Sequence, residues 1–478
     1  MILSAAVMVF AITACGAIDE QNGEDYVQEE IASPSPTPEP TPTLGLAPPF
    51  ERPSPAPIPT PRPTVTLADI ELPASVAWLV EPTWEFDFVF NFRGGMAAVE
   101  INNESGEIHI MGYVNRLGEI VIPLEHRHWA PHYTYRGGPP FAYGSVGIYS
   151  LDHDAVAFFD TDGTQITPFM FGDARNFSEG LAAVSIGDWE SGFEWGFVDP
   201  SVNIVIPTEF EQATYFSEGL AAVARDGRWG FIDTTGNVVI PFEFDIRYRW
   251  IGFDVPMFSD GVAAMWLWDK DATPDNWEAG ARIGQWGVID AAGNVIVPFI
   301  YDEMHNFSEG LAAVRIDGQW GFIDSTGTEV VPPMYEWVDD FSEGLAAASK
   351  EPHRWGFIDA LGNEVIPFGY VGVSNFSGGM AAVARSHSLH DRTQWQWGFV
   401  DRFGSVIVSP QFIRVQDFSY GLAAVQIGSW LGGQWGFVDK EGNVVIPIVF
   451  DDAHSFSEGL AWVRLGDRWG ILEIISGR

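Results

Sequence analysis

Short runs of apolar and polar residues recur along most of this chain, and glycines bound them. Residues 311–316, LAAVRI, alternate in the direction expected of a strand, and they lie between Gly310 and the pair Asp317-Gly318. An Asp-Gly pair at this place is a strong signal for a two-residue hairpin. A second run, QWGFID, follows the hairpin, and the short turn STGT leads from it into EVVPP. The pattern therefore predicts a three-stranded antiparallel meander in each unit, which is 34 residues long from Phe307 to the next start at Phe341.

The unit is repeated ten times. Its first motif, Phe-x-x-Gly before an apolar residue and Ala-Ala, starts at Phe92, Phe177, Phe216, Phe258, Phe307, Phe341, Phe376 and Phe418, with variants at Phe141 and Phe456. Its second motif, Trp-Gly, starts at Trp195, Trp229, Trp286, Trp320, Trp355, Trp397, Trp435 and Trp469. One meander cannot bury both of its faces, whereas stacked neighbours can, so the repetition predicts stacked units. The last unit ends before a third strand, and the segment TWEFDFVF at residues 83–90 could supply one.

These Trp-Gly motifs, with FSEGLAAV and GFID…G…VIP around them, resemble the bacterial WG repeat family over about Phe92 to Gly470. The resemblance implies a β-rich repeat protein and brings no common reaction. We therefore predict an all-β fold of about ten WG repeats, in which tandem three-stranded antiparallel meanders stack as an open twisted solenoid, or superhelix. The alternative is one or more closed β-propeller-like rings, although propellers usually have about four to eight blades, mostly of four strands.

Insertions concentrate in the hairpin between the first and second strands of the units. The interval from a Trp-Gly tryptophan to the next motif phenylalanine is 21 residues in most units, as from Trp320 to Phe341. The interval from the motif glycine to the tryptophan ranges from 10 residues at Gly310 to 25 residues at Gly261. In stacked units these hairpins emerge along one edge, and variable loops on a regular scaffold are where binding sites are usually found.

Several of these variable hairpins carry tryptophans beside Asp, Asn, Gln and Arg. Such side chains suit stacking on sugar rings or a protein hot spot. The alternative is that the rings fold back and cover the ends of the stack. The candidate ligand-binding residues are Trp189, Trp266, Trp268, Trp277, Trp395 and Trp430.

Catalytic and metal chemistry has weak support in the sequence. Asp324 ends a GFID run ahead of a turn glycine, and we expect its carboxylate to bind turn amides rather than calcium. Glu309 and the other SEG glutamates are repeated, which does not suit a unique acid/base pair. His126, His128 and His132 could begin a zinc site, but no cysteine supports it. Nucleophile-elbow, phosphate-loop and dinucleotide motifs are missing from the sequence. We predict no enzymatic activity, no cofactor and no metal.

Charge restricts the possible partners. The formal net charge is −41, with only 24 lysines and arginines. Binding to phosphate needs a basic face, so this charge argues against nucleic acid, and against anionic lipid as a partner of the folded part.

The N-terminal residues resemble a bacterial lipoprotein signal. An apolar run from Ile2 to Ile12, with no Lys or Arg before it, leads into Thr-Ala-Cys-Gly. The resemblance implies a lipid on Cys15. We predict a signal peptide at residues 1–15, an acidic and then Pro-rich disordered linker at 16–63, an N-terminal cap segment at 64–91 and the repeat domain at 92–478. The protein would be extracytoplasmic, anchored to the bacterial cell membrane only through that lipid; the alternative is secretion.

Together these features predict a non-enzymatic repeat scaffold on the cell surface. Its aromatic hairpin loops would bind a protein, or a cell-wall or extracellular glycan. Two alternatives stay open, namely a purely structural spacer and a hydrolase that acts on polysaccharide. The sequence does not identify the ligand or the oligomeric state.

Overall fold

The structure is a computed structural model that describes residues 66–102, 108–129, 144–188, 192–246, 257–268, 284–386, 392–430 and 432–475. The chain divides into two compact units, residues 1–49 and 50–478, and every described residue belongs to the second. Within the described residues the chain forms β-strands and two short 3-10 helices, η1 (Leu67–Asp69) and η2 (Arg392–Gln394). The prediction of an all-β protein is confirmed.

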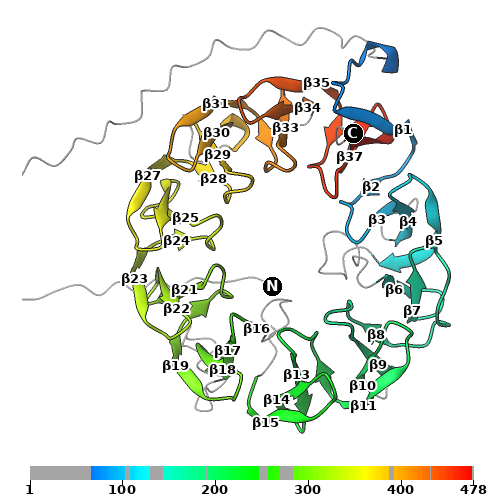
Figure 1. The fold of residues 1–478 in the computed structure, drawn as a ribbon, viewed down its shortest axis with the longest axis vertical. Helices are drawn as coiled ribbons and strands as arrows, with labels where there is room; N and C mark the ends of the chain where they lie inside the picture. The colour runs from blue at the N-terminus through cyan, green and yellow to red at the C-terminus, as the bar shows by residue number, and fades with distance from the viewer. Residues whose placement is uncertain are drawn as a thin grey trace, which may run out of the picture. The chain divides into compact units, whose positions relative to one another are not determined.

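Nine four-stranded antiparallel sheets and one two-stranded sheet are found in the described residues. Figure 1 shows them following one another in chain order. Each four-stranded sheet, here called a module, begins with a strand of two residues and continues with three long strands. In one module, β20 (Glu303–Met304) pairs with β21 (Leu311–Ile316), which pairs with β22 (Gln319–Asp324), which pairs with β23 (Glu329–Tyr335).

The other modules repeat this order. The first has β2 (Phe88–Val89), β3 (Met96–Asn102), β4 (Ile108–Asn115) and β5 (Ile120–Trp129), and the two-stranded sheet of β6 (Ser145–Ser150) and β7 (Ala155–Asp160) follows it. The next three have β8 (Asp173–Ala174), β9 (Ala182–Asp188), β10 (Gly192–Val198) and β11 (Ile204–Phe210); β12 (Gln212–Ala213), β13 (Leu220–Arg225), β14 (Arg228–Asp233) and β15 (Val238–Phe244); and β16 (Phe258–Ser259), β17 (Val262–Trp268), β18 (Gly284–Asp290) and β19 (Val295–Tyr301).

Four modules follow β23 along the chain. Three of them have β24 (Trp337–Val338), β25 (Leu345–Ser349), β26 (Trp355–Asp359) and β27 (Glu364–Tyr370); β28 (Gly372–Val373), β29 (Met380–Arg385), β30 (Gln396–Asp401) and β31 (Val406–Phe412); and β32 (Arg414–Val415), β33 (Leu422–Ile427), β34 (Gln434–Asp439) and β35 (Val444–Phe450). The last module has β36 (Asp452–Ala453), β37 (Leu460–Leu465) and β38 (Arg468–Ile474), with β1 (Val76–Trp84) as its fourth strand.

The prediction of three strands in each unit is wrong, because a short fourth strand lies before or at the motif phenylalanine of the nine four-stranded modules in the described residues. The strand β20 has only two residues, and its one buried apolar side chain is Met304, which pairs with Val314. Alternation becomes visible only over about four to eight residues, so a strand this short leaves no recognisable pattern in the sequence.

The glycine of each Trp-Gly motif lies where the third long strand bulges. The register between β22 and β23 shifts on both sides of Phe322, and a Cβ atom on Gly321 would lie 2.4 Å from the carbonyl oxygen of Val331. A side chain here would push β23 away, so the close approach of the bulged strand requires glycine at this position. Pro332 and Pro333 lie in the same bulged strand, which is the edge strand of the module. Proline has no backbone N–H, so it cannot donate a hydrogen bond to a further strand at this edge.

The hydrophobic core lies between neighbouring modules. Phe322 contacts Phe341 of the next module with ring centroids 4.8 Å apart, and Trp320 and Tyr335 are buried in the same cluster. The equivalent pairs are Phe357–Phe376 at 4.9 Å, Phe399–Phe418 at 4.8 Å and Phe437–Phe456 at 5.2 Å. Each module therefore buries its faces against its neighbours, as the repetition predicts.

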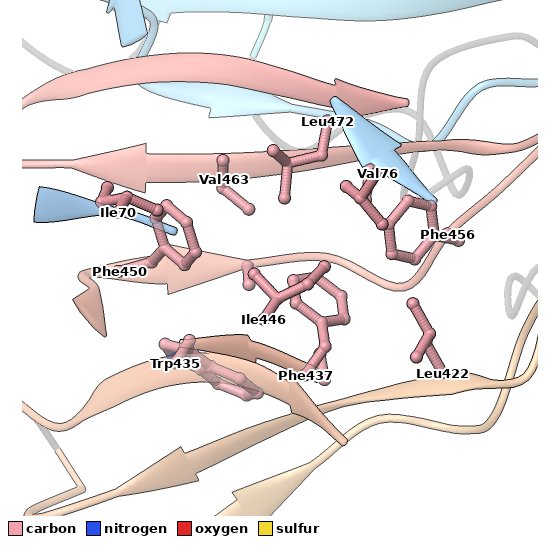
Figure 2. Packing of buried hydrophobic residues seen from close by; sticks show 13 residues of the cluster. Ile70, Val76, Leu422, Trp435, Phe437, Ile446, Phe450, Phe456, Val463 and Leu472 are labelled. Carbon is pink, nitrogen blue, oxygen red and sulfur yellow. The ribbon is translucent and has the colours of Figure 1, made fainter. Parts of the chain in front are cut away.

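The N-terminal strand completes the last module. β1 pairs antiparallel with β38, with Val76 opposite Ile474, and Figure 1 shows β1 in blue beside β37 in red. Figure 2 shows Ile70 and Val76 packed in the core cluster that the last two modules share, together with Phe450 and Leu472. The sequence predicts a donated strand at residues 83–90, whereas the strand that forms is β1, which begins earlier, because residues 88–89 form β2 of the first module.

The last module also contacts the first module directly. The Nε1 of Trp462 donates a 2.9 Å hydrogen bond to the carbonyl oxygen of Phe90, and its ring stacks on Phe92 with centroids 5.8 Å apart. The Nε1 of Trp469 donates a 3.0 Å bond to the carbonyl oxygen of Phe86. Trp462 stands where most other units have the second alanine of Ala-Ala.

Candidate functional site

The two ends of a module have different chemistry. The hairpin between β21 and β22 lies at one end, where Ile316 faces Gln319, and we call this the hairpin end. Leu311 pairs with Asp324, so the motif turn before β21 and the turn after β22 lie together at the opposite end. We call this opposite end the turn end.

The repeated Ser and Glu of the turn end join successive modules. The Oγ of Ser308 donates a 2.9 Å hydrogen bond to the carbonyl oxygen of Phe341, and the amide of Gly344 donates a 2.8 Å bond to the Oε2 of Glu309. Glu309 and Gly310 both have positive φ, 54° and 80°, which forms the tight turn that places the carboxylate there. Several SEG glutamates therefore have a structural role, because their carboxylates accept hydrogen bonds from glycine amides of the next module.

The aspartates after the second long strands bind turn amides, as predicted. The amides of Thr326 and Thr328 each donate a 2.9 Å hydrogen bond to the Oδ1 of Asp324. The hydroxyl of Thr326 also donates to this oxygen, and its bond is the largest cause that lowers the pKa of Asp324. In the equivalent turn, bonds from the side chains of Thr235 and Asn237 lower the pKa of Asp233 to about 2.

The candidate tryptophans do not form one surface within the described residues. Trp189 and Trp277 lie outside those residues. Trp266 and Trp268 extend strand β17, with ring centroids 5.9 Å apart, and Trp266 packs against the core cluster that its module shares with the next. Trp430 is 38% exposed, with the guanidinium of Arg414 5.3 Å from its ring centroid.

Trp395 lines a pocket at the hairpin ends of the modules β24–β27 and β28–β31. The pocket has a volume of about 400 Å³, and its aromatic lining consists of Trp337, Trp355, Trp395 and Trp397. Trp395 is 7% exposed, and its ring lies 6.2 Å from that of Trp397 at an angle of 53°. The rings of Trp395 and Trp397 are therefore inclined to each other. Trp337, which also lines the pocket, is 51% exposed.

The glycine at position 372 makes room for this arrangement. A Cβ atom on Gly372 would lie 2.6 Å from the Cζ3 of Trp395 and 3.3 Å from the Cη2 of Trp397. The same position in the next module holds Arg414, which lies over Trp430 and Trp435. The exchange of a long cationic side chain for glycine allows the indole of Trp395 to pack against the backbone of β28.

The polar lining of the pocket is acidic. Its polar side chains are Asp339 and His353. Apart from these two and the four tryptophans, the lining consists of proline, valine and glycine. Burial, with a smaller contribution from Asp340, raises the pKa of Asp339, while His305 opposes this shift. The Nδ1 of His305 lies 2.8 Å from the Oδ1 of Asp340.

The sequence pointed to one of the four tryptophans of this pocket and missed the others. Trp355 and Trp397 belong to the Trp-Gly motif, so the sequence gives them no role beyond the repeated scaffold. In the structure both side chains are partly exposed. The Trp-Gly tryptophans at 195, 229, 286, 320, 435 and 469 are all buried. Trp337 had one visible signal, because the position four residues before the motif phenylalanine is acidic, basic, Gln or Gly in the other units except the first, which has Phe88.

Two further features of the described residues concern metal ligands and membrane-spanning helices. None of their His, Cys, Asp and Glu side chains form a group of three that could hold a metal ion. His126 is buried, which lowers its pKa, and its ring contacts Phe159 at 5.1 Å; the side chain of His128 and the whole of His132 lie outside the description. In the same part of the chain, no helix has the length and apolar character needed to cross a bilayer.

A comparison with protein families finds one match. The family model described as WG containing repeat matches residues 78–104, 157–188, 195–229, 229–246, 286–320, 320–351, 355–384, 397–429 and 435–469. These nine segments cover more than half of the chain. None of the curated proteins matches the sequence.

Several solved structures are similar at low identity. A eukaryotic initiation factor shares 12% identity with a TM-score of 0.42, over 73% of this chain and 94% of that chain. The C-terminal WD40 domain of Sif2 shares 9% with a TM-score of 0.30, over 83% and 99%. The β-propeller domain of the Trilobed protease from Pyrococcus furiosus shares 8% with a TM-score of 0.29, over 57% and 94%. At these scores the similarities carry nothing about function.

Proposed function

Because the chain belongs to the WG containing repeat family, we propose that it is a non-enzymatic scaffold that binds a protein or glycan partner at its hairpin ends. The observation that carries this proposal is the pocket lined by Trp337, Trp355, Trp395 and Trp397. Exposed indoles held on a rigid sheet offer a large apolar area with little loss of side-chain entropy on binding, which is typical of recognition sites.

We propose further that the modules close into a ring rather than ending as an open solenoid. The pairing of β1 with β38 supports closure, because it joins the two ends of the repeat region in one sheet. The hydrogen bonds from Trp462 and Trp469 to the first module support it independently. A closed array would hold the hairpin ends of all modules in fixed relative positions.

The place of this scaffold in the cell is part of the same proposal. Cys15 and the linker at 16–63 lie outside the described residues, so anchoring rests on the sequence alone. Metabolic labelling with a radioactive fatty acid tests it. Label in the wild-type protein that is lost in Cys15→Ser supports a lipid anchor, whereas label in neither protein favours secretion.

Binding is tested with residues 64–478 on a glycan array and in a pull-down from surface extracts. We expect a saturable partner whose capture falls at least tenfold in Trp337→Ala, since a hot-spot aromatic contributes about 2 kcal/mol or more. Trp430→Ala is the matched control, because Trp430 is an exposed tryptophan outside this pocket. The absence of a saturable partner would favour the structural spacer. Capture that is equally lost in both variants would show that the binding site is not confined to this pocket. Release of sugars from a polysaccharide would instead favour the hydrolase.

A further inference from the structure

Several modules place a positively charged side chain over the ring of their own Trp-Gly tryptophan. The guanidinium carbon lies 5.2 Å from the Trp195 centroid for Arg175, 5.4 Å from that of Trp435 for Arg414, and 5.6 Å from that of Trp469 for Arg464. These distances lie within the range of a cation–π interaction, which extends to about 6 Å. The face of the motif indole is thus a place where this fold repeatedly holds a cation.

Two positions that supply cationic or imidazole groups elsewhere are changed around the pocket. The position two residues before the motif phenylalanine holds Arg175 or His305 in other modules, and it holds Asp339 here. The imidazole of His305 lies 4.8 Å from the ring of Trp320 in its own module. The position that holds Arg414 in the next module holds Gly372 here. The pocket therefore has a carboxylate where the modules of Arg175 and His305 have a basic or imidazole side chain, and a glycine where the next module has Arg414.

We propose that this pocket binds a methylated or quaternary ammonium group, with the indoles enclosing its alkyl surface and Asp339 balancing its charge. The inference rests on the proposed function, since it names the chemical group that the hairpin-end pocket recognises. Aromatic cages of this kind suit quaternary ammonium groups because the cation meets the negative faces of several rings at once.

The lining favours such a cation over a sugar. Sugar rings carry hydroxyl groups on every side and need several polar partners, whereas this pocket offers two polar side chains, Asp339 and His353. The ring of Trp395 is inclined by 53° to that of Trp397 and by 80° to that of His353, so these rings enclose a compact group rather than forming a flat platform. Anions are disfavoured by Asp339, by nearby Asp340 and by the net charge of −41.

The charged and titratable groups at the site set the dependence on pH. Asp339 must be ionised to balance the ligand, and burial raises the pKa of its carboxyl group. Binding therefore weakens on acidification, and it begins to weaken at a higher pH than an ordinary aspartate would give. The other titratable groups that face the site are His305, which lies beside Asp340, and His353, which lines the pocket.

Calorimetric titration of the full chain with choline tests the proposal. The control ligand is its neutral carbon isostere, in which a tert-butyl group replaces the trimethylammonium group. We expect choline to bind about tenfold more tightly than the isostere, because the two have the same shape and differ in charge. Phosphocholine is the third ligand. It tests whether the pocket takes its ammonium group from a free compound or from a lipid headgroup, since only the headgroup carries the phosphate.

Two variants and one control locate the site. Trp337→Ala should weaken choline binding at least tenfold, and Asp339→Asn should remove most of the preference for choline over the isostere. Trp430→Ala should leave both affinities unchanged. Melting temperatures of the variants separate loss of binding from loss of folding.

Three results overturn the proposal. They are equal affinity for choline and the isostere, binding that Asp339→Asn leaves unchanged, and no binding of either ligand. If a glycan or protein partner is captured through Trp337 while choline does not bind, the ammonium assignment fails and the proposed function stands. If neither a partner nor choline binds, both fail.

Discussion

The Oγ of Ser457 donates a 2.6 Å hydrogen bond to the carbonyl oxygen of Phe92, which lies 365 residues earlier in the chain. The Oγ of Ser342 makes the same bond to the carbonyl oxygen of Phe376 in the module that follows it, at 2.8 Å. The carboxylate of Glu458 likewise accepts from the amides of Gly94 and Gly95. The last module thus binds the first with the same contacts that join several other pairs of successive modules.

A disulfide can test the pairing that joins the two ends of the repeat region. Ala77 is directly opposite Glu473 in the register of β1 and β38. Opposite residues of antiparallel strands have Cα atoms about 4.5–5.5 Å apart, which is within the range that a disulfide spans. In a Cys15→Ser background, Ala77→Cys with Glu473→Cys should oxidise within one chain and migrate differently on a non-reducing gel.

The control pair for this experiment is Ala77→Cys with Glu441→Cys, which places the second thiol in an exposed turn of the preceding module. Only the first pair should form an intramolecular bond. Equal oxidation of the two pairs, or none in either, would contradict the pairing of β1 with β38.

Removal of one inter-module hydrogen bond should have a small, measurable cost. Ser342→Ala loses the bond to Phe376, and we expect the free energy of unfolding to fall by about 1 kcal/mol. Ser405→Ala, at an exposed turn position, should change it by less than about 0.5 kcal/mol. Urea denaturation measures both, and equal effects would contradict a role for the repeated serine between modules.

Trp462 should contribute more to stability than most single residues of the repeat. Its side chain is buried in the cluster shared by the first and last modules, so Trp462→Ala leaves a cavity there and removes the bond to Phe90. We expect a loss of about 3–5 kcal/mol in the free energy of unfolding, measured by chemical denaturation. A loss below about 1 kcal/mol would show that the contact between these modules is weak.

The sequence predicted the repeated part of the fold better than its exceptions. The alternation in LAAVRI, the hairpin pair Asp317-Gly318 and Asp324 each matched local structure, because each acts within a few residues of itself. The two-residue strand that contains Met304 could not be predicted, because one buried side chain leaves no periodicity. The pocket shows the same limit for a different reason. Trp337 and Trp397 come together only through contact between modules, which the spacing of motifs does not report.

The stability contributed by the turn aspartates should depend on pH in a defined direction. Hydrogen bonds lower the pKa of Asp233 to about 2, from 3.8 for an ordinary aspartate side chain. A lowered folded-state pKa gives a contribution that is present above the unfolded value and is lost as the pH falls through the folded value. The window for Asp233 therefore runs from about pH 4 down to about pH 2.

The variant Asp233→Asn isolates this contribution. It should melt at a lower temperature than the wild type at pH 7, because amides of the turn lose a charged acceptor. The two melting temperatures should converge as the pH approaches 2, where the wild-type carboxyl group is also neutral. A difference that stays constant across this range would contradict the assignment.

The substitution of Gly372 tests how the pocket is built. A Cβ atom in Gly372→Ala would lie 2.6 Å from the Cζ3 of Trp395, so the indole must move. We expect a loss of about 1–3 kcal/mol in stability and a changed near-ultraviolet circular dichroism spectrum. Gly369→Ala, three residues before the start of β28, is the matched control, because a Cβ atom there meets nothing within 4 Å. Similar behaviour of the two variants would contradict the close packing of Trp395 on Gly372.

The pairing of β1 with β38 has a consequence for the way the protein is made. β1 is among the first folded residues to leave the ribosome, and its partner strand, which ends at Ile474, is the last. Any product that stops short of this strand leaves β1 unpaired, with an apolar edge exposed to aggregation or proteolysis. The order of the strands therefore delays this module until late in synthesis, because only a chain extended through β38 has a partner for β1.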